Sequence, residues 1–214
     1  MPSCARKEHV MRLVKAIAAT ALAFVCAASS ALALDATRSG GGAAGLLPLR
    51  AVVSAPGGAA DLCAKYSWAC AAGTSAASFG ADQMEMAVRI NRAANARIRP
   101  VADLVQYHAA ENWAMPTARG GDCEDYALYK KAKLIEAGVS PDRLLLATVL
   151  DRKGDSHAVL VLRTDTADLV LDNLRGAVKP WDETGYTFLR MQDPRNPARW
   201  VATMAGGMLP GVSS

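Results

Sequence analysis

The sequence Gly120-Gly121-Asp122-Cys123-Glu124-Asp125-Tyr126-Ala127 places a cysteine at the predicted start of a helix. Two glycines precede the start, Asp122 is a typical N-cap residue, and apolar side chains at helical spacing continue to Gly138. We therefore predict a helix over residues 123–137. The first turn of such a helix points its N–H groups and the positive end of its dipole at the Cys123 sulfur, and both favour a thiolate.

The chain on either side of this helix has two different patterns. Residues 81–97 predict an amphipathic helix and residues 101–113 a shorter one. After the helix, Leu144–Leu150, His157–Arg163 and Asp168–Leu171 are rich in Val and Leu, and the short turns between them permit only antiparallel pairing. The predicted fold class is therefore α+β, with N-terminal helices and an antiparallel β-sheet packed on the helix that starts with the cysteine.

Two further segments, residues 186–191 and 199–203, are expected to add edge strands to this sheet. Residues 34–60 are rich in Gly, Ala and Ser and predict a flexible lead-in. The folded domain is then expected to span residues 61–205, and the Gly-, Pro- and Ser-containing residues 206–214 are expected to form a loose tail.

The N-terminal segment has the composition of an export signal. Residues 1–15 are basic, residues 16–34 are uncharged, and Ala31-Leu32-Ala33 supplies a small-x-small cleavage pattern. We predict a signal peptide over residues 1–33 and hence a periplasmic protein. An uncleaved membrane anchor is the alternative, but Ala, Ser and Thr dominate the uncharged stretch and make its insertion marginal.

The charge distribution argues against nucleic acid as the main partner. The chain has a formal charge of +4, but 4 of its 24 basic residues and 1 of its 20 acidic residues lie in the first 33 positions. The remainder is close to neutral, whereas binding to phosphates requires a clustered basic surface. The default oligomeric state for such a domain is a monomer.

The five cysteines divide into three groups. Cys4 and Cys26 belong to the N-terminal segment. Cys63 and Cys70 predict a local disulfide in an oxidising compartment, and zinc is the weaker alternative because no His or second Cys pair lies nearby. Cys123 remains, and an unpaired thiol in an exported protein is either buried and inert or retained for its reactivity.

A cysteine nucleophile requires a base and a third group that orients the base. His157 begins the second predicted strand and Asp172 follows the third, so antiparallel pairing brings the two side chains together. Alternatively, His157 is a half-buried structural histidine and Asp172 a turn residue. Of the other two histidines, His9 lies in the export segment and His108 in a polar stretch without an evident partner.

These motifs resemble the bacterial transglutaminase-like cysteine proteinase family, which includes the periplasmic LapG-type proteases. The resemblance spans roughly residues 60–203 and rests on the run around Cys123, on Trp113, on Ser156-His157-Ala158-Val159-Leu160 and on Val170-Leu171-Asp172-Asn173. It implies a papain/transglutaminase-like fold and a triad of Cys123, His157 and Asp172. Trp113 is expected either to line the cleft or to lie in the core.

The resemblance also implies an activity and partners. The expected protein is an exported cysteine endopeptidase that cleaves a large surface adhesin in biofilm control and is regulated by an inner-membrane receptor. Two other functions use the same residues. If the acyl group of a Gln side chain passed from the enzyme to an amine, the protein would be a transglutaminase, and if that group passed to water, the protein would be a deamidase. If the triad were vestigial, the protein would be a non-catalytic calcium-binding interaction module.

Three carboxylates, those of Asp122, Glu124 and Asp125, flank the cysteine and raise the pKa of its thiol. Their charge is offset either by helix capping, with Asp122 as N-cap and Asp125 at the third helical position, or by a bound Ca²⁺. The resemblance implies calcium at Asp122 and Glu124. Because Ca²⁺ takes six to eight oxygen ligands, main-chain carbonyls, water or a residue such as Asp142 must complete the shell.

Overall fold

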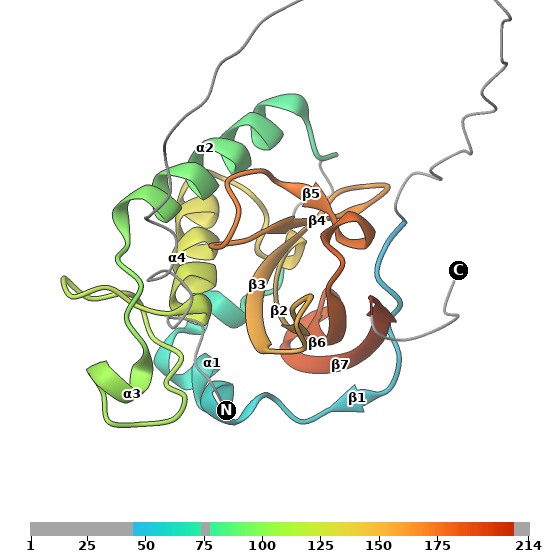
Figure 1. Ribbon diagram of the computed structural model, residues 1–214. Helices are drawn as coiled ribbons and strands as arrows, with labels where there is room; N and C mark the ends of the chain where they lie inside the picture. Colours follow the sequence, from blue (N-terminus) through green and yellow to red (C-terminus); the bar gives the residue numbers. More distant parts are fainter. Residues whose placement is uncertain (1–44, 74–77, 208–214) are drawn as a thin grey trace, which may run out of the picture.

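The computed structural model describes residues 45–73 and 78–207 (Figure 1). The fold is α+β, as the sequence predicts, with one seven-stranded antiparallel sheet and its two long helices on one side of that sheet. The predicted signal peptide lies outside the described residues, and so do residues 208–214 of the predicted tail. Among the helices of the described part, none has the length and apolar character needed to cross a membrane.

Of the three helices predicted from the sequence, those over residues 81–97 and 123–137 are confirmed. The α-helices are α1 (Leu62–Lys65), α2 (Ala81–Arg97), α3 (Asp103–Gln106) and α4 (Cys123–Glu136), and the 3₁₀ helices are η2 (Gly57–Ala59), η3 (Ser67–Cys70), η4 (Pro141–Arg143) and η5 (Trp181–Thr184). The helix predicted over 101–113 is wrong beyond residue 106. The chain turns back there, because the Asp103 side chain accepts a hydrogen bond from the Asn112 N–H and closes residues 107–112 into a loop.

The sheet has the order β1-β7-β6-β2-β3-β4-β5. Its strands are β1 (Val52–Val53), β2 (Leu144–Leu150), β3 (Ser156–Arg163), β4 (Asp168–Leu171), β5 (Lys179–Pro180), β6 (Thr187–Asp193) and β7 (Asn196–Gly206). The prediction that residues 186–191 and 199–203 form edge strands is wrong in position. Since β6 pairs with β2 and β7 pairs with β6, both lie inside the sheet, and the edges are β1 and β5.

Residues 45–60, which the sequence assigned to a flexible lead-in, are packed on the domain. Val52 of β1 pairs with Val201 of β7, so this segment closes one edge of the sheet. Leu47 is buried, and its N–H donates a 2.7 Å hydrogen bond to Asp168 Oδ2. The folded domain therefore begins before residue 61, because this segment pairs with the edge of the sheet and Leu47 packs into an apolar core.

Each face of the sheet has its own apolar core. On one face α4 packs against β3 and α2 packs against α4, as Figure 1 shows. The buried side chains of this layer include Ala127, Leu128, Leu134, Leu146, Leu160 and Leu162. On the opposite face, the core includes Leu47, Leu145, Val149, Val161, Tyr186 and Phe188. Successive side chains of β2 and β3 point alternately into the two cores. Because both faces are buried, both strands have continuous apolar runs.

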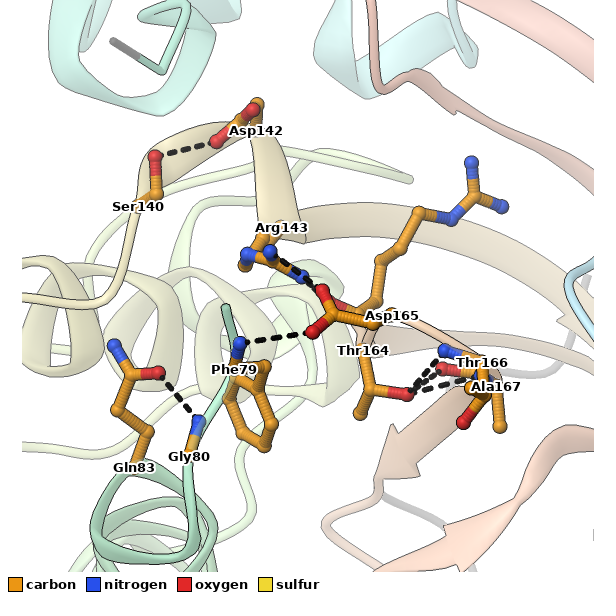
Figure 2. A network of polar contacts seen from close by, with 11 residues as sticks. Phe79, Gly80, Gln83, Ser140, Asp142, Arg143, Thr164, Asp165, Thr166 and Ala167 are labelled. Carbon is orange, nitrogen blue, oxygen red and sulfur yellow. Dashed lines mark hydrogen bonds and ion pairs between the residues drawn. The ribbon is translucent and has the colours of Figure 1, made fainter. Parts of the chain in front are cut away.

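A polar network ties the start of α2 to the sheet (Figure 2). Arg143 of η4 contacts Asp165 in the β3–β4 turn at 2.7 Å, and Asp165 accepts a 3.2 Å hydrogen bond from the Phe79 N–H. Gln83 accepts a 3.1 Å bond from the Gly80 N–H at the start of the helix. These contacts fix the position of α2, which in turn holds the loop after β4.

The predicted disulfide between Cys63 and Cys70 is confirmed. It joins α1 to η3, next to the loop that carries Trp113. Within the described ranges, Cys123 is the one free cysteine, and its side chain is buried. The arrangement leaves a single thiol at the start of α4, in contact with the sheet.

Candidate active site

Cys123 is the first residue of α4, and its sulfur contacts the start of β3. The Ala158 N–H donates a hydrogen bond to Cys123 Sγ at 3.3 Å. Gly120 has φ of 128°, which favours glycine. A Cβ on Gly121 would come within 2.4 Å of Asp125 Oδ2. The two glycines therefore let the chain enter α4 at an angle that brings the cysteine against the sheet.

His157 and Asp172 form a buried pair beside this sulfur. They come from the adjacent antiparallel strands β3 and β4, in which Leu160 pairs with Leu171. His157 Nε2 lies 2.9 Å from Asp172 Oδ1, and the two residues are 4% and 3% exposed. The structure thus brings together the three residues that the sequence singled out.

The charges of the pair are mutually stabilising. Burial lowers the pKa of His157, but hydrogen bonds with Asp172 and Cys123 outweigh burial and raise that pKa to about 10. Burial raises the pKa of Asp172, whereas the contacts with His157, Tyr186 and the Leu174 N–H hold that pKa below its usual value. The site therefore favours an aspartate beside an imidazolium, which is the pairing that stabilises a neighbouring thiolate.

A second group of titratable side chains lies on the other side of the cysteine. Asp103, Asp122 and Glu124 are all buried, and one carboxylate oxygen from each lies within 4.8 Å of the others. Burial, followed by the charge of Asp122, raises the pKa of Asp103. Burial and the neighbouring Cys123 raise the pKa of Glu124 well above its usual value. Three buried carboxylates at this separation repel one another unless a proton or a cation neutralises them.

The donor set fits a hard cation. Asp103 Oδ1 and Glu124 Oε1 are buried and have no hydrogen-bond partner among the residues that the structure describes. Glu124 Oε2 is the acceptor of a 3.2 Å contact from Cys123 Sγ. Carboxylate oxygens are the ligands that Ca²⁺ takes. The two predicted ligands, Asp122 and Glu124, lie close together in the structure, and Asp103 lies beside them.

Helix capping does not account for these acids. Asp122 occupies the N-cap position of α4, but its side chain makes no cap hydrogen bond and Oδ2 accepts instead from the Asp103 N–H at 3.1 Å. Asp125 Oδ1 accepts from the Ala114 N–H at 3.0 Å and so holds a loop. Asp142 follows the opposite end of α4 and bonds to Ser140, as Figure 2 shows, which makes it unsuitable as a further ligand.

A cavity of about 270 Å³ opens over the cysteine. Its lining includes Gly58, Glu111, Trp113, Cys123, His157 and Arg190. Trp113 is 3% exposed and meets Trp200 in a T-shaped contact with ring centroids 5.7 Å apart, so it both lines the cavity and belongs to the core. A Cβ on Gly58 would come within 2.7 Å of the Trp113 ring, and the glycine is therefore needed for this close approach.

Sequence reasoning missed two residues of the site. Asp103 lies 19 positions before Asp122 in a segment predicted to be helical, and Tyr186 lies 14 positions after Asp172 in a segment assigned to the sheet edge. Neither has a local motif. Only the tertiary fold, through the loop after α3 and the central position of β6, brings them to the site.

The chain matches one protein family over most of its length. The family model described as bacterial transglutaminase-like cysteine proteinase matches residues 49–207. A comparison with curated protein sequences gave no match. Among solved structures, Legionella pneumophila LapG is 20% identical with a TM-score of 0.47, and the alignment covers 57% of this chain and 69% of that one. Its calcium-bound form is 21% identical with a TM-score of 0.48, covering 60% of this chain and 75% of that one.

The family match includes every element of the sheet, the helix that starts at Cys123 and the strands that carry His157 and Asp172. The chain therefore belongs to the bacterial transglutaminase-like cysteine proteinase family, and it is a cysteine peptidase with a transglutaminase-like fold.

Proposed function

We propose that the protein is an exported cysteine endopeptidase with the catalytic triad Cys123, His157 and Asp172. The observation that carries the proposal is the convergence of three elements at one cavity. The N-terminus of α4 supplies the thiol, and β3 and the end of β4 supply a histidine and an aspartate 2.9 Å apart. A buried, electrostatically coupled group of this kind is typical of catalytic sites.

In the proposed mechanism Cys123 attacks the carbonyl carbon of the substrate peptide bond. Because His157 Nε2 is bonded to Asp172, its Nδ1 is the nitrogen that takes the thiol proton. The same nitrogen gives the proton to the amine leaving group, and a thioester forms between Cys123 and the acyl part of the substrate. Water activated by His157 then hydrolyses the thioester and restores the thiol.

Negative charge develops on the substrate oxygen during both steps. The main-chain N–H of Cys123 lies in the first turn of α4, where N–H groups point out of the helix end. It is therefore placed to donate to that oxygen as one half of an oxyanion hole. The α4 dipole adds to the same stabilisation.

The cation site proposed beside the nucleophile takes Ca²⁺, held by Asp122, Glu124 and Asp103. A bound Ca²⁺ would neutralise the carboxylates that otherwise raise the free energy of a thiolate at Cys123. What supports this site is the proximity of three buried carboxylates, two of which have oxygen atoms without a hydrogen-bond partner in the described part of the chain. Glu124 also contacts the sulfur, which couples the two sites.

The substrate and the setting follow from the family resemblance and the N-terminal sequence. We propose a periplasmic monomer, exported by the signal peptide over residues 1–33, that cleaves a large surface adhesin in biofilm control. An inner-membrane receptor that sequesters the protease is the proposed regulator. The cavity over Cys123 is the proposed place where the scissile bond of that substrate binds.

The test is cleavage of candidate adhesin fragments by the mature protein, with and without EGTA. Cys123→Ala and His157→Ala are expected to abolish cleavage, and His108→Ala serves as the matched histidine control because His108 is exposed. Cleavage that persists in Cys123→Ala would refute the mechanism. Cleavage that is unaffected by EGTA would remove calcium from it.

The same experiment separates the other functions. New peptide termini found by mass spectrometry support hydrolysis of the main chain, whereas Gln–Lys crosslinks or deamidated Gln would identify acyl transfer on side chains. Calcium binding without any modification of the fragments would identify an interaction module. No feature of the cavity favours either of these over hydrolysis.

A further inference from the structure

Tyr186, which lies between η5 and β6, contacts both members of the His157–Asp172 pair. Its hydroxyl donates a 2.6 Å hydrogen bond to Asp172 Oδ2. Its ring meets the His157 ring in a T-shaped arrangement, with centroids 5.7 Å apart and an interplanar angle of 86°. The side chain is buried in the core of the sheet face opposite α4. One residue thus holds two parts of the proposed triad.

The two oxygens of Asp172 are used differently. Oδ1 accepts from His157 Nε2 and from the Leu174 N–H, both at 2.9 Å. For Oδ2, Tyr186 is the hydrogen-bond donor that the described structure provides. Because Asp172 is almost fully buried, water cannot replace a donor that is lost. The tyrosine hydroxyl therefore fixes the plane of the carboxylate and stabilises its charge.

The hydroxyl remains a donor at all working pH values. Burial and the negative charge of Asp172 raise the pKa of Tyr186, so the phenol stays protonated. The loop that carries Asp172 is also held from the other side, since Asn95 Nδ2 donates to the Asp172 carbonyl at 2.8 Å. The main chain at Asp172 is thus held by α2, whereas Tyr186 holds the Oδ2 atom of its side chain.

We propose that Tyr186 is a positioning residue of this peptidase: its hydroxyl orients the Asp172 carboxylate toward His157, and its ring fixes the imidazole plane. The inference rests on the triad named under the proposed function. Tyr186 acts through Asp172 and His157 and has no role in bond making or breaking.

The first test is Tyr186→Phe, which keeps the ring and its packing and removes only the hydroxyl. A hydrogen bond to a charged group accounts for about a tenfold effect or more, so kcat is expected to fall at least tenfold while KM stays within about twofold. Tyr126→Phe is the matched control, because it also removes the hydroxyl of a buried tyrosine, one that bonds to the Ile98 carbonyl. Equal kcat values for the two variants would overturn the proposal.

A double-mutant cycle separates positioning from a general structural effect. If Tyr186 acts through the Asp172 carboxylate, Tyr186→Phe should change kcat less than about twofold in an Asp172→Asn background. Fully multiplicative losses would show that the hydroxyl acts elsewhere. The melting temperature is expected to fall more in Tyr186→Phe than in Tyr126→Phe, since the first loses a hydrogen bond to a charged carboxylate and the second loses one to a neutral carbonyl.

Alkylation of Cys123 by iodoacetamide provides a readout that requires no substrate. The label on the Cys123 peptide, measured by mass spectrometry at pH 7, is expected to appear about tenfold more slowly in Tyr186→Phe than in the wild type and Tyr126→Phe. An unchanged rate would contradict the inference alone. Rapid, His157-dependent alkylation in a protein that cleaves no fragment would contradict the peptidase proposal alone.

Discussion

His157 Nε2 and Asp172 Oδ1 lie 2.9 Å apart in a part of the protein that water barely reaches. In that setting the aspartate does two things for the histidine: it fixes the ring so that Nδ1 faces the cysteine, and its charge stabilises the imidazolium. An asparagine at position 172 can still form a hydrogen bond but has no charge to offer.

Asp172→Asn is therefore expected to lower kcat by about 10²- to 10⁴-fold with little change in KM. The measurement is steady-state hydrolysis of a peptide that the wild type cleaves. Asp182→Asn, at an exposed position in η5, is the control and should retain wild-type rates. Similar losses in both variants would show that Asp172 has no special place in the reaction.

The sequence could predict that Cys123, His157 and Asp172 lie together because each of them sits in a local pattern. Cys123 opens a helix after two glycines, and His157 and Asp172 lie at the ends of neighbouring strands joined by a short turn. Proximity of such residues follows from antiparallel pairing alone. The strands β2, β3 and β4 were predictable for the same reason.

The features that the sequence could not predict depend on contacts between distant parts of the chain. Asp103 reaches the acidic cluster only because residues 107–112 form a loop instead of the predicted helix. Tyr186 reaches Asp172 because β6 crosses to pair with β2, a choice that no turn signal encodes. Similarly, β1 is too short for a periodic pattern, and only its partner β7 gives it a place.

Calcium is expected to stabilise the protein through the acidic cluster. A ligand that binds only the folded state adds about 2.7 kcal/mol to the free energy of unfolding at one hundred times its Kd. Asp103→Asn removes one of three carboxylates and should weaken binding by about tenfold or more, since affinity follows ligand charge. The rise in melting temperature with added CaCl₂ is then smaller in the variant.

Without calcium, the same substitution should stabilise the protein. Because Asp103 and Asp122 repel each other at close range, Asp103→Asn is expected to raise the melting temperature in EGTA. Asp61→Asn, at an exposed position, is the control for a general loss of charge. If CaCl₂ raised the melting temperatures of the wild type and Asp103→Asn by the same amount, the cluster would not be a calcium site.

The disulfide between Cys63 and Cys70 is expected to stabilise the fold without taking part in the reaction. It closes a loop with a sequence separation of 7, and the chain-entropy relation gives about 2–3 kcal/mol for a loop of that size. Replacing both cysteines by alanine should lower the free energy of unfolding in urea by that amount, while kcat at 25 °C stays near the wild-type value. A large fall in kcat would show that η3 positions the cavity.

Lys130 of α4 is fully buried, and its Nζ has no hydrogen-bond partner among the described residues. Burial lowers its pKa to about 7, and the charge of Asp172 offsets only part of that effect. Its neighbour Lys131 is equally buried, but Lys131 Nζ donates a 2.8 Å hydrogen bond to Gln192 Oε1. A buried amine without a hydrogen-bond partner destabilises the folded state, and the position of Lys130 Nζ over the Tyr126 ring, 5.8 Å from its centroid, offsets only part of that cost.

Lys130→Met is therefore expected to raise the free energy of unfolding at pH 7 by about 1–3 kcal/mol, since methionine fills a similar volume without a charge. Lys131→Met is the matched control and should gain less, because it removes a hydrogen bond to Gln192. Urea unfolding in a Cys123→Ala background measures both without thiol–disulfide exchange. A loss of stability in Lys130→Met would mean that its amine has a role in the folded state.

The rise in the free energy of unfolding in Lys130→Met should also depend on pH in a defined direction. The pKa of Lys130 is about 7 in the folded chain and about 10.4 in the unfolded one, so between these values the unfolded chain holds a proton that the folded chain lacks. The stability contributed by the wild-type lysine thus rises with pH over that window, while below pH 7 its penalty is complete. The advantage of Lys130→Met is expected to be largest at pH 7 and to shrink toward zero near pH 10. An advantage of equal size at both pH values would mean that improved packing, and not removal of a buried charge, is its cause.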